Sequence, residues 1–162
     1  MPRQWKHMGV IENRIVQLGY ALPEGRTPGA TYVPTVVVPD HNLVYTAGDV
    51  ARKPNGSTVT GKLGVDLSIE DGYEAAKLTA LNLLGSLKAE LGDLDHINRV
   101  IKLLCMVNSA PDFEEHPAVA NGGSDLLVEI FGDKGNHARS AVGMLIPGNI
   151  CISIDMIVEI CP

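Results

Sequence analysis

The sequence predicts an α+β fold in which two helices pack on one face of a mixed β-sheet. Three observations predict it. Ser68–Leu91 repeats apolar residues at helical spacing, Arg99–Val107 is an almost unbroken apolar run typical of a central strand, and strand-like segments occur in pairs near both ends. The order is strand, strand, long helix, strand, helix, strand, strand, which is typical of an α+β layer structure.

Length and composition restrict the class of protein. The 162 residues are long enough for one buried core, and we expect residues 1–162 to form a single domain. Nineteen acidic against 13 basic residues give a net charge of −6, which argues against a nucleic-acid surface. No apolar run reaches the roughly 18 residues needed to span a bilayer, so no membrane segment is expected. Residues 1–7 lack the apolar core of a signal peptide. The three cysteines, Cys105, Cys151 and Cys161, lack CxxC spacing, so we expect them to be buried free thiols of a protein in the reducing cytoplasm.

The first part of the chain predicts a helix and then a pair of strands. Apolar residues at helical spacing predict a short helix over residues 8–19, and glycines and prolines predict a loop over residues 20–31. Tyr32–Val38 and Leu43–Thr46 are rich in residues that favour strands and are separated by a polar turn. Gly48 follows, where the missing side chain allows another group to approach the backbone closely.

The middle of the chain predicts the two helices of the layer. Ser68 with Asp71 three residues later resembles a capping box, and Gly92 is a typical end for the long helix. The second helix is expected over Pro117–Phe131, although Gly122-Gly123 weakens its helical propensity. The apolar stripe of the long helix predicts that it covers one face of the sheet.

The C-terminal part predicts a β-hairpin. Two apolar runs, Arg139–Ile146 and Ile150–Ile160, are separated only by the turn Pro147-Gly148-Asn149. Arg139 would then lie at the mouth of this hairpin. Its planar guanidinium group matches a carboxylate or phosphate with two parallel hydrogen bonds. The alternative is a surface arginine that forms a weak, exposed ion pair.

The second face of the sheet is also predicted to be apolar. We expect side chains of the C-terminal strands to be buried between subunits, because they cannot all face the helices, and therefore expect a homo-oligomer. These side chains are Val142, Met144, Ile152, Ile154 and Ile157.

Several kinds of chemistry have no support in the sequence. Walker, GxGxxG, HExxH and GxSxG motifs are absent, and the five histidines are scattered without metal-ligand spacing, so no metal site is expected. Ser140 has no nearby base in the sequence that would make it a nucleophile. The groups that remain to bind a ligand are an arginine, backbone N–H groups that glycines leave accessible, and scattered polar side chains.

Four segments, in the same order, resemble the Rid family, which is also called the YjgF or endoribonuclease L-PSP family. Ala138–Val142 looks like its Ala-Arg-Ser-x-Val motif, and Tyr45–Gly48 is similar to its Thr-Ser-Gly segment. Asn108–Phe113 and Val119–Gly122 look like its loop and second-helix segments. The resemblance covers residues 32–160, so residues 1–31 would form an N-terminal helix and loop extension typical of a longer branch.

The resemblance implies a chorismate-mutase-like trimer in which the sheets form a central barrel and clefts lie between subunits. Family members hydrolyse enamines and imines of 2-amino acids to 2-keto acids and ammonia without a cofactor. Carried over to this sequence, Arg139 would bind the substrate carboxylate, with Tyr32, Gly48 and Asn121 in the same cleft. Read without the resemblance, these three are also consistent with a strand-edge aromatic, a β-bulge and a helix-surface residue.

Two positions depart from the family pattern. The deaminating members carry a glutamate on the last strand where this chain has Ser153, and the cysteine often found after the arginine is Ala141. Asp155 shares a strand face with Ser153 and would supply the acid if it points into the cleft. A serine is a poor general base, so binding is better supported than catalysis.

Three functions therefore remain open from the sequence. The first is an imine or enamine deaminase, and the second is a non-catalytic trimer that binds small carboxylates. The third, an endoribonuclease or translation inhibitor, is disfavoured by the net negative charge.

Overall fold

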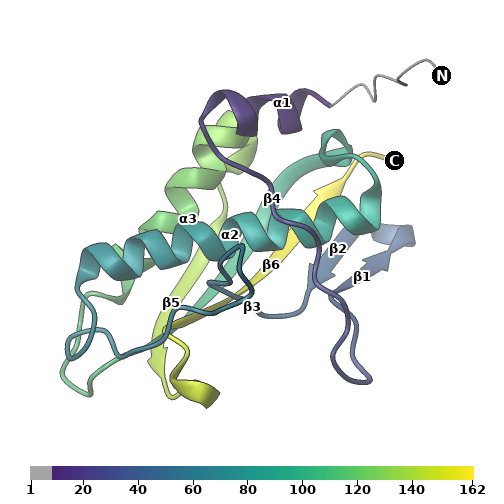
Figure 1. Cartoon of the computed structure of the whole chain (residues 1–162). Helices are drawn as coiled ribbons and strands as arrows, with labels where there is room; N and C mark the ends of the chain where they lie inside the picture. The colour runs from purple at the N-terminus through teal and green to yellow at the C-terminus, as the bar shows by residue number, and fades with distance from the viewer. Residues whose placement is uncertain (1–8) are drawn as a thin grey trace.

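A computed structural model of the chain describes residues 9–162 (Figure 1). Among these residues, no helix combines the length and apolarity that crossing a bilayer requires. The elements are α1 (Val10–Gln17), β1 (Thr35–Val38), η1 (Pro39–His41), β2 (Leu43–Thr46), β3 (Asp49–Val50), α2 (Ile69–Leu91), η2 (Leu94–His96), β4 (Ile97–Asn108), α3 (His116–Phe131), η3 (Gly132–Gly135), β5 (Ala138–Met144), η4 (Pro147–Asn149) and β6 (Ile152–Ile160).

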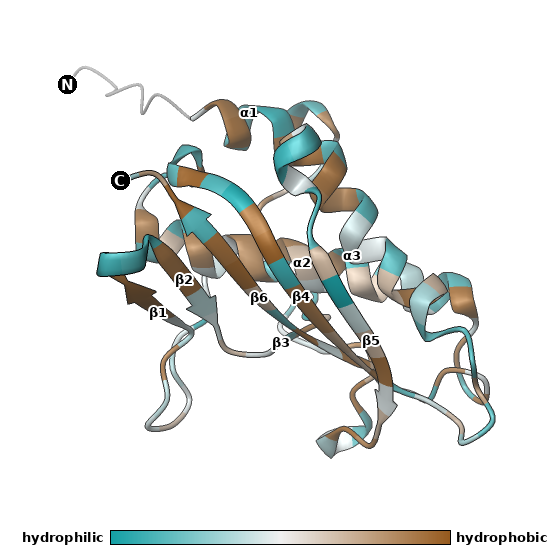
Figure 2. Ribbon diagram, turned by 180° about the vertical axis from the view of Figure 1, so that it is seen from behind, coloured by the Kyte–Doolittle hydropathy of each residue, from teal (hydrophilic) through white to brown (hydrophobic). Residues whose placement is uncertain are grey.

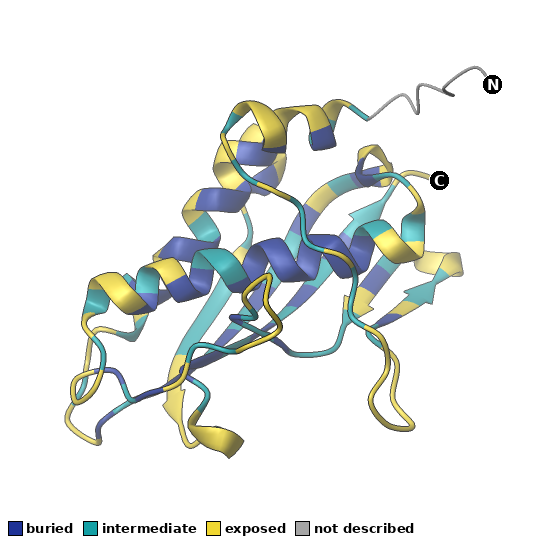
Figure 3. Ribbon diagram, viewed as in Figure 1, coloured by how far each residue is buried: buried dark blue, intermediate teal, exposed yellow. Residues whose placement is uncertain are grey.

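The strands form one mixed sheet in the order β1-β2-β6-β4-β5, with β3 also paired to β6. Strands β4 and β5 run parallel, and the pairs β1–β2, β2–β6, β3–β6 and β4–β6 are antiparallel. Helices α2 and α3 cover one face, where the buried residues concentrate (Figures 1 and 3). The predicted α+β fold and the central position of the apolar strand β4 are therefore confirmed.

Helix α2 begins and ends where local sequence signals predict. The Ser68 side chain accepts a hydrogen bond from the Asp71 amide, and the Asp71 carboxylate accepts one from the Ser68 amide, so the capping box is complete. Gly92 ends the helix with a positive φ of 80°, which a glycine adopts without steric cost. Leu83, Leu84 and Leu87 are buried on the face of α2 that packs into the core.

The glycine pair in α3 permits a close helix crossing. A Cβ atom at Gly122 would overlap the carbonyl oxygen of Tyr73 on α2 and lie 2.7 Å from its carbonyl carbon. At Gly123 the nearest atom to such a Cβ would be 3.4 Å away, which is an ordinary contact. Gly122 is therefore a packing residue, although in the sequence it indicates only a weakened helix.

The predicted C-terminal hairpin is wrong. Strands β5 and β6 are not hydrogen-bonded to each other, because β4 lies between them and pairs with both. Residues 145–151 carry the chain past the end of β4 and are held there by hydrogen bonds to Asn108. The Asn108 amide donates to the Cys151 carbonyl at 2.9 Å, and Asn108 Nδ2 donates to Asn149 Oδ1 at 3.0 Å. A short connection thus joins two antiparallel strands that are not neighbours, and Arg139 lies on an edge strand, not at a hairpin mouth.

The second predicted apolar face needs a partial correction. Ile152 and Ile154 are fully buried and face the helices, so within one chain they already belong to the core. The face without helices, called the open face below, is lined by the alternate residues of each strand. Its large apolar members are Val36, Val38, Leu43, Tyr45, Leu104, Met106, Val142, Met144 and Ile157. Figure 2 shows this face toward the viewer, with hydrophobic segments on several strands.

The N-terminal helix is present as α1, while residue 8 of the predicted helix lies outside the described residues. The Asp95 carboxylate caps α1, because it accepts hydrogen bonds from the amides of Val10 and Ile11, both at 2.8 Å. Two of the cysteines are buried as predicted, but Cys161 is exposed, because it follows the last strand.

Candidate functional site

Arg139 is held on the helix side of the edge strand β5. Its neighbours across the sheet, Leu103 and Met156, are buried against the helices. Its Nη1 atom donates to Asn121 Oδ1 at 2.8 Å and to Ser124 Oγ at 3.0 Å, and both acceptors are on α3. Arg139 and Asn121, which the family resemblance places in one cleft, are therefore hydrogen-bonded to each other within one chain.

The other edge of the Arg139 guanidinium is available to a ligand. Each Nη atom of arginine carries two hydrogens, and both hydrogens of Nη1 are used. No hydrogen bond or ion pair joins Nε or Nη2 to any of residues 9–162. A pocket of about 390 Å³ opens beside this group and is lined by Ser124, Val128, Asn136, His137 and Arg139. The Nε–Nη2 edge has the geometry that matches a carboxylate with two parallel hydrogen bonds.

Gly48, Ser153 and Asp155 lie together on the open face. A Cβ atom at Gly48 would be 2.7 Å from Ser153 Oγ and 2.9 Å from Asp155 Oδ1, so only glycine leaves these two groups uncovered. Burial raises the pKa of Asp155, because the charged carboxylate loses solvation. Asp155 thus shares its strand face with Ser153, and its pKa lies above the ordinary value of an aspartate.

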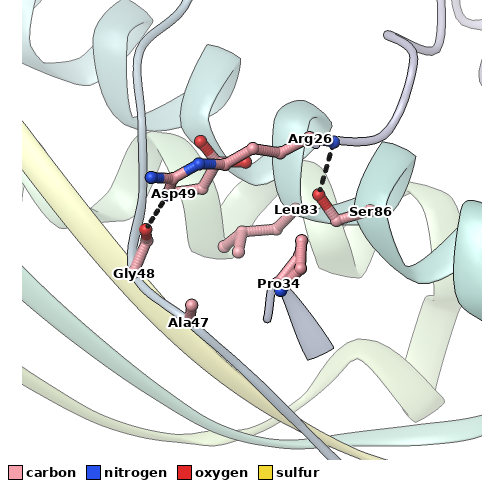
Figure 4. A pocket seen from close by; sticks show the side chains of 7 residues that line it. All are labelled: Arg26, Pro34, Ala47, Gly48, Asp49, Leu83 and Ser86. Atoms are coloured by element: carbon pink, nitrogen blue, oxygen red, sulfur yellow. Dashed lines mark hydrogen bonds between the residues drawn. The ribbon is translucent and has the colours of Figure 1, made fainter. Parts of the chain in front are cut away.

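Tyr32 is connected to Gly48 through Arg26, a residue that the sequence analysis did not single out. Arg26 Nη1 donates to the Gly48 carbonyl at 3.0 Å, Nη2 donates to Tyr32 Oη, and the backbone amide donates to Ser86 Oγ. Figure 4 shows the Arg26 side chain reaching from Ser86 to Gly48. An arginine in a loop with no periodicity gave no signal for this role.

The two groups of candidate residues lie on opposite faces of the sheet in one chain. Arg139 belongs to the cross-strand row with Leu103 and Met156 on the helix side, whereas Asp155 pairs with Leu104 on the open face. Successive side chains of a strand point to opposite faces. A single chain therefore does not bring Arg139 to Ser153 and Asp155.

Residues 12–159 match a family model described as "YjgF/chorismate mutase-like, putative endoribonuclease". The chain belongs to this family. The Trypanosoma cruzi protein TCP17 is 37% identical over 154 residues, covering 94% of this chain and 95% of that protein. A solved Agrobacterium tumefaciens protein of unknown function is 43% identical with a TM-score of 0.85, over 94% of both chains. A Shewanella oneidensis structure described as a "putative endoribonuclease" is 31% identical with a TM-score of 0.88, over 94% of this chain and all of that one.

The motifs by which the sequence resembles the YjgF family are distributed over both groups. The Ala138–Val142 motif forms most of β5, and Val119–Gly122 provides Asn121 on α3. Tyr45–Gly48 ends at the glycine beside Asp155. Ala141, which stands in place of the frequent cysteine, faces the helix side like Arg139 and packs against the core.

Among residues 9–162, one group of carboxylates has ligand atoms close enough together to hold a metal ion. Glu12, Asp93 and Asp95 each place a ligand atom within 4.8 Å of the others. Their contacts serve other purposes, since Asp95 caps α1, Asp93 accepts a hydrogen bond from the Asp95 amide and Glu12 pairs with Lys88. We assign this group to the attachment of α1.

Proposed function

We propose that this YjgF-family protein is a cytoplasmic, cofactor-independent deaminase that hydrolyses imines and enamines of 2-amino acids to 2-keto acids and ammonia. The observation that carries the proposal is the partly engaged guanidinium of Arg139. One nitrogen is anchored to α3, and the Nε–Nη2 edge, which has no partner among residues 9–162, lies at a pocket. A small substrate carboxylate is the group that fits this edge.

A complete site on this proposal is formed between two copies of the chain in a homotrimer. Arg139 and Asn121 from one subunit would face Gly48, Ser153, Asp155 and Tyr32 of the next. Two features support a second copy as the occupant of the open face. The two groups lie on opposite faces of one chain, and the open face keeps large apolar side chains uncovered, including Tyr45 at 45% and Met144 at 43% exposure.

The proposed chemistry divides between the two groups. Arg139 fixes the substrate carboxylate and thereby the orientation of the adjacent imine carbon. Ser153 and Asp155 hold the attacking water, whose oxygen becomes the keto oxygen of the product. The water oxygen adds to the imine carbon while Asp155 passes one water proton to the nitrogen, which gives a carbinolamine. Asp155 then passes the hydroxyl proton to the amine nitrogen, so that the C–O double bond forms as the C–N bond breaks and ammonia leaves.

We expect the wild-type protein to accelerate the loss of enzymatically generated 2-iminopropionate. Asp155→Asn should slow this reaction, by up to the about 10²–10⁴-fold that a positioned acid or base contributes. Ser153→Glu should increase the rate, because it restores a carboxylate where the family has one. Absorbance of the imine, followed in a coupled assay, measures both effects. Unaccelerated loss with wild type and Ser153→Glu alike, while pyruvate still binds, would favour the non-catalytic carboxylate binder.

The proposed homotrimer is tested by measuring the molar mass of the protein in solution. We expect light scattering to give three times the 17.3 kDa chain mass at micromolar concentration. Val142→Asp, on the open face, should lower this mass, because a buried unpaired charge is costly at an interface. Val65→Asp is the control, since Val65 is 69% exposed and lies outside the sheet. A wild-type monomer would contradict the shared site.

A further inference from the structure

A line of hydrogen bonds leads from the backbone of η3 to Arg139. His137 Nδ1 lies 2.6 Å from the Gly135 carbonyl oxygen, and His137 Nε2 lies 2.9 Å from Ser124 Oγ. Ser124 Oγ in turn accepts the hydrogen bond from Arg139 Nη1 at 3.0 Å. The line therefore connects the loop before β5, helix α3 and β5 itself.

The chemistry of the partners fixes the direction of every bond in this line. A carbonyl oxygen only accepts, so His137 Nδ1 carries the proton and donates to Gly135. In the neutral ring Nε2 is then an acceptor, and the Ser124 hydroxyl must donate to it. With its hydrogen committed to His137, Ser124 presents its lone pairs to Arg139. Burial lowers the pKa of His137 below its ordinary value; the hydrogen bond to Gly135 opposes this shift and the nearby Arg139 charge adds to it, so the neutral ring is favoured.

The start of the line is rigid. Gly135 is buried, and a Cβ atom there would overlap the Leu127 carbonyl oxygen and lie 2.7 Å from its carbon. The turn that carries the Gly135 carbonyl is therefore pressed directly against α3. A fixed backbone oxygen at one end orients, in turn, the imidazole ring, the serine hydroxyl and the guanidinium group.

We propose that His137 and Ser124 are positioning residues that hold Arg139 by Nη1, so that its Nε–Nη2 edge receives the substrate carboxylate. This inference rests on the proposed function, because it assigns a role to the surroundings of the proposed carboxylate site. Asn121 supplies the second acceptor for Nη1. Specificity for a carboxylate over a neutral group then depends on side chains that need not touch the ligand.

The test compares binding of pyruvate and of its neutral amide, pyruvamide, by calorimetry. Ser124→Ala and His137→Leu should weaken pyruvate binding about fivefold to tenfold, since each removes one support of a charged donor and not the donor itself. Pyruvamide binding should change much less, because an amide offers the guanidinium one acceptor oxygen and no negative charge. Ser124→Thr and His137→Gln keep a hydroxyl and a side-chain acceptor, respectively, and should restore most of the pyruvate affinity.

Each result separates this inference from the function on which it rests. Equal weakening of pyruvate and pyruvamide would mean that the two residues only maintain the fold, and would overturn the positioning role. Wild-type pyruvate affinity in Ser124→Ala and His137→Leu, with binding lost in Arg139→Ala, would also overturn it while leaving the carboxylate site in place. Unchanged pyruvate binding in Arg139→Ala would reject the site itself.

Discussion

We expect Arg139→Ala to weaken the binding of small carboxylates strongly and to leave the fold intact. The expected loss is at least about tenfold in affinity, because a hydrogen bond to a charged group contributes about 1.5–3 kcal/mol and the guanidinium offers two. Arg139→Lys recovers only part of it. A single ammonium group cannot occupy the acceptors on Asn121 and Ser124 and at the same time present a two-nitrogen edge to the ligand.

Calorimetric titration with pyruvate measures this effect, and circular dichroism checks the fold. Arg99→Ala is the matched control. It removes the same charge from the neighbouring strand β4, where Arg99 is exposed. Equal pyruvate affinity in Arg139→Ala and Arg99→Ala would show that the carboxylate binds elsewhere.

Gly122→Ala destabilises the fold strongly, whereas Gly123→Ala is tolerated. The methyl group at position 122 would occupy the space of the Tyr73 carbonyl, so α2 and α3 must separate over a buried contact. We expect a cost of about 3 kcal/mol, the upper part of the range for overpacking. For a chain of this length that lowers the melting temperature by about 6–12 °C.

The neighbouring glycine provides the control within the same helix. A Cβ at position 123 meets nothing closer than 3.4 Å, and alanine favours a helix over glycine by about 1 kcal/mol. Calorimetry should therefore give a melting temperature below wild type for Gly122→Ala and at or above wild type for Gly123→Ala. Similar melting temperatures for both would mean that the helix crossing adjusts without cost.

Features that depend on neighbouring residues were predictable from the sequence, whereas features that depend on distant ones were not. The Ser68–Asp71 cap and the Gly92 end of α2 are local signals, and both are confirmed. The pairing of β5 with β4 was missed, because a short connection shows that two strands are antiparallel but not that they are neighbours.

The two faces of the sheet also could be predicted only in part, because distant residues decide which face is covered. Alternation along β6 places Ile152 and Ile154 on one side and Ser153 and Asp155 on the other, and this much is readable from the sequence. Which side the helices cover is set by the whole topology, so the two isoleucines were assigned to the wrong environment. Arg26 was missed because its contacts, with Gly48, Tyr32 and Ser86, all arise from folding of an irregular loop.

The position of β5 at the border of the sheet has a consequence for biosynthesis. An outermost strand leaves a row of backbone amides and carbonyls without partners from the sheet, and such a row is a template for addition of a foreign strand. Strand β5 also has two exposed apolar side chains, Val142 and Met144, which favour association with other apolar surfaces. On the proposed homotrimer, a newly synthesised chain is thus most prone to aggregate before it assembles with other copies. The yield of folded protein in a cell should therefore depend on how quickly the subunits assemble.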